Sequence, residues 1–167
     1  MADQAEDVVS WKTVTPGITV VTMKRPPANA LGIALLDGLH AAMDAAERAG
    51  DVKVMVIGSA QPGFFAAGAD IKHLSSIDAE SFTEYGDKMR AVNDRLAAAG
   101  WISIAAIDGI AYGDEPRDGV VRGRRYVTAP VSDRLGARRW LVVVGAGEAL
   151  PDHLARQALL AAERLVR

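Results

Sequence analysis

The alternation of hydrophobic and polar positions predicts six elements between residues 8 and 107. Two short apolar runs around a Thr-Pro-Gly turn indicate an opening hairpin. Two later segments repeat apolar residues at helical spacing, and a glycine follows each of them. Two nearly continuous apolar runs are typical of strands buried on both faces. The predicted elements are strands at Val8–Trp11 and Ile18–Met23, a helix carrying Leu35, Leu39, Met43 and Ala46 and ending at Gly50, a strand at Val52–Ile57, a helix at Asp78–Ala99 and a strand at Ile102–Ile107.

The order of these elements is strand, strand, helix, strand, helix, strand. It indicates the α/β class with mostly right-handed crossovers. The segment Gly58–Gly68 is rich in small residues and is expected to be a loop. The second helix has one apolar stripe for the core, formed by Phe82, Tyr85, Met89, Val92 and Leu96.

The composition fits a single globular domain but changes character near Gly113. The chain has 167 residues, half of them hydrophobic, and it has no cysteine, which excludes disulfides, cysteine-ligated zinc and a thiol nucleophile. All five lysines precede Gly113, whereas the ten basic residues after it are all arginine. We therefore expect a core at residues 1–113 and a divergent, scrambled remainder of the same domain at residues 114–167.

The overall charge gives no reason to expect a polyanionic partner. The formal net charge is -2 and the sequence pI is about 5.9. The first seven residues carry three acids rather than a basic and then an apolar stretch, and no apolar run approaches membrane-spanning length. We expect a cytoplasmic protein with no metal site and no nucleic-acid or membrane partner.

Two junctions between a buried strand and a small-residue turn are candidates for chemistry. In Phe64–Lys72 the chain is expected to start a short helix, so that free N–H groups near Ala69 point outward. Such groups can bind an anion or a developing oxyanion. In Ile104–Gly113 a strand ends in two glycines, which lets a ligand approach the main chain. Either segment alone is more often a packing feature than a site.

Three stretches together resemble the crotonase superfamily, the enoyl-CoA hydratase/isomerase family. Arg25–Leu31 resembles its N-terminal Pro-x-x-Asn-Ala-Leu stretch, and Phe65–Lys72 resembles its Phe-x-Ala-Gly-Ala-Asp-Ile-Lys loop. Ala105–Gly113 resembles the lead-in to its Gly-Gly-Gly-x-Glu-Leu turn. The resemblance covers Val8–Gly113, and it implies a crotonase-like spiral of ββα units that is incomplete at the C-terminus.

The resemblance also implies a function and a site. Family members act on an acyl-CoA thioester and hold its carbonyl oxygen between two backbone N–H groups, an arrangement called an oxyanion hole. It implies that Ala69 supplies the first N–H group; coenzyme A is part of the substrate, so no separate cofactor is implied. The implied substrate-binding residues are Ala67, Gly68, Asp70, Ile71 and Lys72. Asp70 also suits a first-turn acid that favours the helix dipole, and Lys72 also suits a solvated lysine.

The family pattern fails directly after Gly113, where the chain reads Asp114-Glu115-Pro116-Arg117. By strict count the water-activating glutamate falls on Arg117, which cannot act as a general base. If two glycines have been lost, Glu115 is that glutamate, and the catalytic candidates are Ala69, Gly113 and Glu115. We hypothesise a frame change or an internal deletion near Gly113 in a truncated chain.

Two consequences follow for activity and assembly. The first alternative to an enzyme is a non-catalytic remnant with weak or no acyl-CoA binding. The resemblance implies a homo-oligomer, which family members build with C-terminal helices; we expect those helices to be missing here, because the given sequence ends at Arg167.

Two other functions have weaker support in the sequence. Trp140–Gly147 reads as a strand that runs into Gly-x-Gly, as in nucleotide-binding folds, but Leu150 sits where a small residue is required. The arginines after Gly113 are typical of a solvated face, because only Tyr126 and Trp140 are available there to stack on bases.

Overall fold

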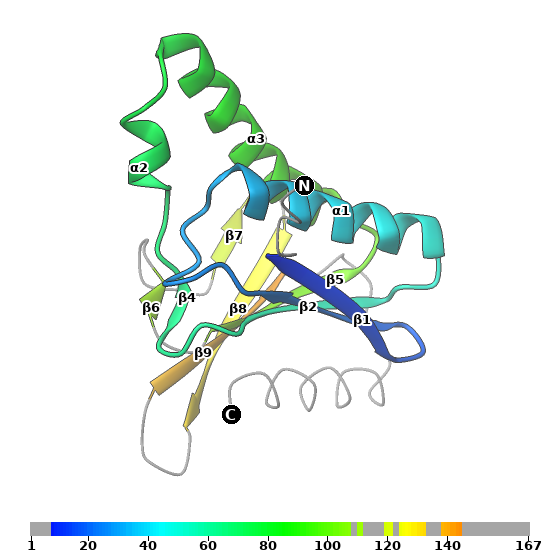
Figure 1. Ribbon diagram of the computed structural model, residues 1–167. Helices are drawn as coiled ribbons and strands as arrows, with labels where there is room; N and C mark the ends of the chain where they lie inside the picture. The colour runs from blue at the N-terminus through cyan, green and yellow to red at the C-terminus, as the bar shows by residue number, and fades with distance from the viewer. Residues whose placement is uncertain (1–7, 108–109, 112–118, 122–123, 133–137, 145–167) are drawn as a thin grey trace, which may run out of the picture.

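The computed structural model describes residues 8–107, 110–111, 119–121, 124–132 and 138–144. A seven-stranded sheet has the order β1-β2-β3-β5-β9-β8-β7, and a second, two-stranded sheet pairs β4 with β6 (Figure 1). The strands are β1 Val9–Thr15, β2 Ile18–Met23, β3 Val54–Ser59, β4 Phe64–Ala66, β5 Ile102–Ile107, β6 Ile110–Ala111, β7 Gly119–Val121, β8 Arg124–Ser132 and β9 Arg138–Val144. The helices are α1 Ile33–Ala49, α2 Ile71–Leu74 and α3 Ala79–Ala98.

The connections confirm the α/β class and the ββα repeat. β1 and β2 form an antiparallel hairpin, and β2, β3 and β5 run parallel, with α1 in the first crossover and α3 in the second. After β6 the described strands change direction: β9 pairs antiparallel with both β5 and β8. Because a nucleotide-binding βαβ unit places its first strand in a parallel sheet, this antiparallel pairing of β9 speaks against that function.

The core lies between the sheet and the two long helices, which cover the same face of β2 and β3 (Figure 1). Alternate strand residues point to that face, as the period of a strand requires. Val21 and Met23 of β2 and Met55 and Ile57 of β3 are all at most 8% exposed. The helix residues that meet them are Leu35, Leu36, Leu39, Ala42, Met43, Ala46, Tyr85 and Val92.

Three predictions need correction: the burial of Phe82, the loop at Gly58–Gly68 and the length of the first strand. Phe82 is not part of the core: it is 55% exposed, because the first turns of α3 extend beyond α1 and the sheet (Figure 1). The predicted loop Gly58–Gly68 contains β4, a strand too short to leave a periodic signal. β1 continues to Thr15 although its residues are mostly exposed, since an edge strand needs no apolar alternation.

Glycines in the two long helices face very different surroundings. A Cβ at Gly38 of α1 would lie 2.7 Å from Cβ of Val9, whereas a Cβ at Gly86 of α3 would meet no atom within 4 Å. Alanine is a better helix former than glycine by about 1 kcal/mol. Alanine should therefore stabilise the helix at Gly86. At Gly38 the close contact with Val9 should make the same substitution destabilising.

We predict opposite effects for the two matched substitutions. Gly86→Ala should raise the free energy of unfolding by about 0.5–1 kcal/mol. Gly38→Ala should lower it by about 1–3 kcal/mol through overpacking against Val9. Val9→Ala removes Cγ2, the other Val9 atom that would lie 2.7 Å from the new Cβ, so Gly38→Ala should cost less in a Val9→Ala background. Urea unfolding followed by circular dichroism measures all three, and a stabilised Gly38→Ala variant would contradict the packing of α1 on β1.

Candidate functional site

The structure brings the two candidate junctions side by side. β4 comes from the first junction and β6 from the second, and they pair parallel with Phe64 opposite Ile110 and Ala66 opposite Ala111. The Ile110 N–H also donates to the Gly63 carbonyl at 2.8 Å. The main chain therefore joins segments that are more than forty residues apart. The two further catalytic candidates, Gly113 and Glu115, lie outside the described residues.

The N-terminal stretch that carries the first motif joins the same place. Residues 28–31 run beside residues 67–69: the Ala67 N–H donates to the Ala28 carbonyl at 3.0 Å, and the Leu31 N–H donates to the Gly68 carbonyl at 2.8 Å. Leu31 and Ala69 form a parallel bridge. All three motif stretches thus meet through main-chain hydrogen bonds.

Asn29 fixes the shape of this junction. It is 0% exposed and adopts a left-handed backbone conformation with φ of 52°, which asparagine tolerates better than most residues. Its Oδ1 accepts from the Arg25 N–H at 2.8 Å, and its Nδ2 donates to Ser59 Oγ at 2.7 Å and to the Phe65 carbonyl at 3.1 Å. One buried amide therefore connects the 25–31 segment, the end of β3 and β4.

The direction of the Ala69 N–H group follows from its peptide plane. In a trans peptide the carbonyl and the N–H point in opposite directions. The Gly68 carbonyl points at the Leu31 N–H, so the N–H of Ala69 points away from the 28–31 segment. Among the residues that the structure describes, no acceptor takes this N–H group. An unused donor with a fixed direction is what an oxyanion site requires.

Asp70 is the N-cap of α2 rather than an acid of its first turn. Its Oδ1 accepts from the N–H groups of Lys72 at 3.1 Å and His73 at 3.3 Å, and its Oδ2 accepts from Arg25 Nη2 at 2.6 Å. The predicted short helix is confirmed, but those two helix amides are already occupied. Of the amides at this helix start, the N–H of Ala69 has no acceptor among the described residues, and its part in an oxyanion site stays a prediction.

The pKa of Asp70 is lowered in the folded protein. Burial of the carboxyl group, which is 8% exposed as a residue, by itself raises the pKa. The hydrogen bond and charge of Arg25, with the amides of His73 and Lys72, outweigh burial and favour the carboxylate. The pair approaches closely because Gly32 lacks a side chain: a Cβ there would lie 2.9 Å from Asp70 Oδ2.

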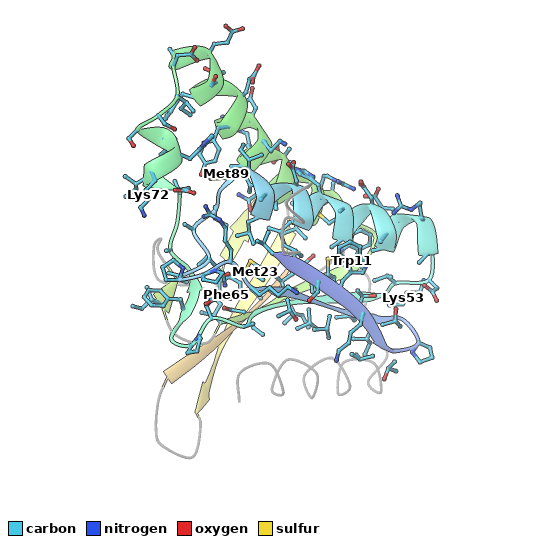
Figure 2. The ribbon with its side chains drawn as sticks, in the orientation of Figure 1. Trp11, Met23, Lys53, Phe65, Lys72 and Met89 are labelled. Carbon is cyan, nitrogen blue, oxygen red and sulfur yellow. The ribbon has the colours of Figure 1, made fainter. Side chains whose placement is uncertain are left out.

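The remaining predicted substrate-binding residues differ in exposure. Ala67 and Gly68 are half-buried beside the 28–31 segment, whereas Ile71 is 77% exposed. Lys72 is exposed, and its side chain points outward from α2 (Figure 2). Their contact with a substrate stays a prediction.

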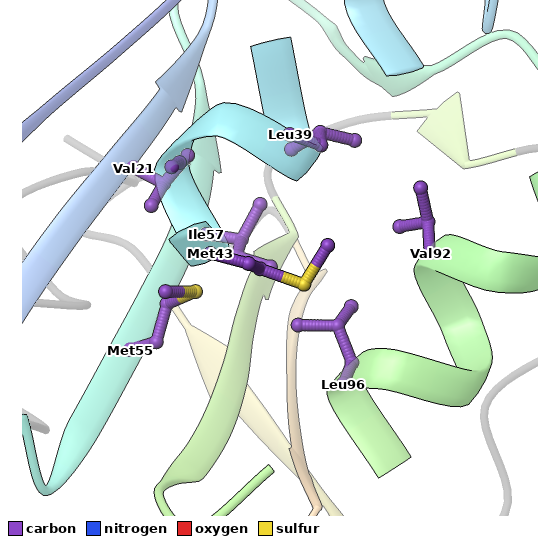
Figure 3. Close-up of a pocket in the computed structure, with 8 residues that line it drawn as sticks. Val21, Leu39, Met43, Met55, Ile57, Val92 and Leu96 are labelled. Atoms are coloured by element: carbon purple, nitrogen blue, oxygen red, sulfur yellow. The ribbon is translucent and has the colours of Figure 1, made fainter. Parts of the chain in front are cut away.

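An apolar gap under the helices is not a candidate for this chemistry. It lies between α1, α3 and the strands β2 and β3, where Met43 and Leu96 face each other (Figure 3). It offers room for about one water molecule and no polar group to bind it. It is lined by Val21, Leu39, Ala42, Met43, Met55, Ile57, Val92 and Leu96. In the described part of the chain, no group of three or more His, Asp or Glu residues could hold a metal ion.

Sequence reasoning missed the part that Arg25, Asn29 and Tyr85 play in supporting the loop. Arg25 and Asn29 lie in the first motif, but their partners are 45 and 36 residues away. Tyr85 was assigned only to the core stripe of α3. Its hydroxyl accepts from the Asp70 N–H at 3.2 Å and donates to the Leu31 carbonyl, so it also belongs to the junction.

Comparison with known proteins shows what the chain resembles. A model of the family described as enoyl-CoA hydratase/isomerase matches residues 13–114. Mitochondrial methylglutaconyl-CoA hydratase of Mus musculus is 37% identical over 98 residues, which are 58% of this chain and 31% of that protein. The solved enoyl-CoA hydratase of Bacillus anthracis has a TM-score of 0.59 at 27% identity, over 62% of this chain and 41% of that one. The enoyl-CoA hydratase of Thermoplasma volcanium has a TM-score of 0.54 at 28% identity, over 60% and 40%.

The matched region has clear limits. The chain spans less than half the length of these relatives. The family match ends one residue after Gly113, where the composition changes. No helix among the described residues is long and apolar enough to cross a bilayer. A cytoplasmic location, and the division into residues 1–113 and 114–167, stay predictions.

We predict that Asn29 is the most sensitive polar position of the junction. Asn29→Ala removes three hydrogen bonds and leaves alanine at positive φ, so the free energy of unfolding should fall by about 2–4 kcal/mol. Asn29→Gly loses the same bonds but accepts the backbone conformation, and should be the less destabilised variant. Urea unfolding of both measures the difference. Equal stability of the two would show that the left-handed conformation is not retained.

We predict a pH-dependent contribution from Asp70. Since its pKa is lowered on folding, its stabilising effect is complete above the unfolded pKa of about 3.9 and is lost as pH falls through the folded pKa. The difference in unfolding free energy between the wild type and Asp70→Asn should be largest near pH 6 and should shrink below about pH 4. Asp87→Asn, which affects an exposed pair with Arg90, is the control and should change stability little. A pH-independent difference for Asp70→Asn would contradict the ionised pair with Arg25.

Proposed function

We propose, from the premise that the chain belongs to the enoyl-CoA hydratase/isomerase family, that it binds an acyl-CoA thioester and polarises its carbonyl group. The observation that carries the proposal is the N–H group of Ala69. It points away from the segment that pairs with Gly68, and no described acceptor takes it. The pairing of β4 with β6 supports the proposal further, since it brings the strand that leads to Gly113 beside the loop that carries Ala69.

The chemistry that suits such a donor is the addition of water to a 2-enoyl thioester, or a related enolate reaction. As the new bond forms at the β-carbon, negative charge collects on the thioester oxygen. A fixed backbone dipole costs no reorganisation when this charge appears, and each such donor is worth about 10²- to 10³-fold in rate. In this proposal Ala69 supplies the first donor, and the turn that begins at Gly113 supplies the second.

Glu115 is the proposed general base. If two glycines have been lost after Gly113, Glu115 stands at the position of the family's glutamate. Strict counting places Arg117 at that position instead. An arginine keeps its proton and cannot activate water. Catalysis by this chain therefore depends on Glu115.

Acyl-CoA binding without turnover is the second candidate. It is favoured by Asp114 and Arg117, which stand by strict count where the family needs a glycine donor and a glutamate. In that case Ala69 still polarises the carbonyl group, but no group takes the proton from water. The matched relatives are named as hydratases. For this chain we propose an enoyl-CoA substrate of unspecified chain length.

We predict that Ala69→Pro, which removes the N–H group, lowers crotonyl-CoA hydration by about 10²-fold. Loss of the conjugated thioester absorbance measures hydration, and equilibrium dialysis measures binding. Ala79→Pro is the matched control: Ala79 is the first residue of α3, where proline is tolerated, so its activity should match the wild type. Circular dichroism checks that both variants fold.

The same assay separates the two candidate functions. Hydration that disappears in Glu115→Gln supports the enzyme, and binding without hydration supports the non-catalytic protein. If crotonyl-CoA neither binds nor reacts, the proposal fails.

A further inference from the structure

Tyr85 is a buried core residue with a hydroxyl group that serves only main-chain atoms. The residue is 4% exposed and packs in the core between α3 and the sheet. Among the described residues, its hydroxyl accepts from the Asp70 N–H at 3.2 Å and donates to the Leu31 carbonyl. A phenylalanine would fill the same space. Packing of the core therefore does not need the hydroxyl group. Its described hydrogen bonds go to main-chain atoms of Asp70 and Leu31 at the junction.

The hydrogen bond from the Asp70 N–H fixes the peptide group that follows Ala69, and the hydrogen bond to the Leu31 carbonyl ties Tyr85 to the neighbouring segment. The peptide before Ala69 is held through its carbonyl, because the Leu31 N–H donates to Gly68. The peptide after Ala69 is held through its N–H, because Asp70 donates to the Tyr85 hydroxyl. Both peptide planes around Ala69 are thereby tied to the Leu31 side. The N–H and the carbonyl of Ala69 are both directed away from it, since a trans peptide opposes its carbonyl and its N–H, and the N–H is the donor of the two.

Asp70 supplies a second, independent support from the other end of the loop. Its carboxylate caps α2 and accepts from Arg25 at 2.6 Å, and Arg25 also donates to the Ala30 carbonyl at 2.7 Å. The ring centroids of Tyr85 and His73 lie 5.3 Å apart, so the tyrosine also contacts the short helix α2. The loop is thus held from two parts of the chain that lie far from it in the sequence, the 25–31 segment and α3.

We propose that Tyr85 and Asp70 are positioning residues that aim the Ala69 N–H at the carbonyl oxygen of a bound thioester. This inference rests on the proposed function and extends it. Removing the Tyr85 hydroxyl frees the Leu31 carbonyl and the Asp70 N–H, which lie on either side of the hydrogen bond from Leu31 to the Gly68 carbonyl. Removing the charge of Asp70 weakens the hold on Arg25, which donates to the Ala30 carbonyl of the peptide that carries the Leu31 N–H. Either change loosens the bond to the Gly68 carbonyl, and the N–H of Ala69 in the same peptide then loses its fixed direction. Polarisation of the thioester falls, whereas affinity for coenzyme A, which does not touch the Tyr85 side chain in this proposal, changes little in Tyr85→Phe.

A chromophoric ligand tests this without turnover. The probe is 2,4-hexadienoyl-CoA, whose conjugated absorbance moves to longer wavelength when its carbonyl oxygen accepts hydrogen bonds. The test variants are Tyr85→Phe and Asp70→Asn. The matched controls are Thr83→Val, which removes a hydroxyl from the same helix, and Asp78→Asn, which alters the N-cap carboxylate of α3. The red shift at saturation and the dissociation constant are measured for each protein.

We expect the red shift to fall by at least half in Tyr85→Phe and in Asp70→Asn, with the dissociation constant of Tyr85→Phe within about threefold of the wild type. Thr83→Val and Asp78→Asn should keep the full shift. A merely structural role would lower affinity or folded fraction, but it would leave the shift of the bound probe unchanged.

Several outcomes would overturn the inference. A full red shift in Tyr85→Phe, or in Asp70→Asn if Tyr85→Phe does not fold, rejects the positioning role while leaving the proposed function intact. A wild type that binds the probe without a red shift, or does not bind it, rejects the proposed function and the positioning role together.

Discussion

The junction depends on one main-chain pairing, between residues 28–31 and residues 67–69. The Leu31 N–H donates to the Gly68 carbonyl at 2.8 Å, and this bond sets which way the next N–H points. The buried amide of Asn29 holds the first of the two segments in a left-handed turn and ties it to Phe65. Without this pairing the loop that carries Ala69 would have no fixed relation to the sheet.

The sheet and helices explain why the pairing occurs there. β2 and β3 are parallel neighbours, so the chain leaves both at the same edge of the sheet. The 25–31 segment follows β2 and the 60–69 segment follows β3, so both emerge side by side. β4 then continues toward β6, which follows β5, the next parallel strand. Three consecutive parallel strands thus deliver three motif stretches to one place, which is why the spacing of those stretches carried a family signal.

The sequence predicted the regular part of this arrangement and missed the irregular part. Apolar periodicity identified α1, α3, β2 and β5 nearly to the residue, because these elements bury one or both faces. β4 escaped prediction because it is three residues long and half-buried. The family resemblance located Ala69 as a candidate donor, but the Arg25–Asp70 pair and the bonds of Tyr85 join residues 45 and 54 positions apart. No local pattern records such contacts. Gly113 and Glu115 lie outside the described residues, so the second half of the predicted site stays a prediction.

Asp70 places a carboxylate directly beside the proposed donor at Ala69. A carboxylate next to the proposed donor at Ala69 would oppose the growth of negative charge on a thioester oxygen. Here Arg25 lies 2.6 Å from one carboxylate oxygen, and the amides of Lys72 and His73 bind the other. The pair is close to neutral, and its hydrogen bonds turn both oxygens toward the protein. A residue that would weaken the proposed oxyanion site as a free anion therefore stabilises the loop as a paired one. Arg25 links the two features: it lowers the pKa of Asp70, and it donates to the Ala30 carbonyl of the peptide whose N–H, that of Leu31, binds the Gly68 carbonyl.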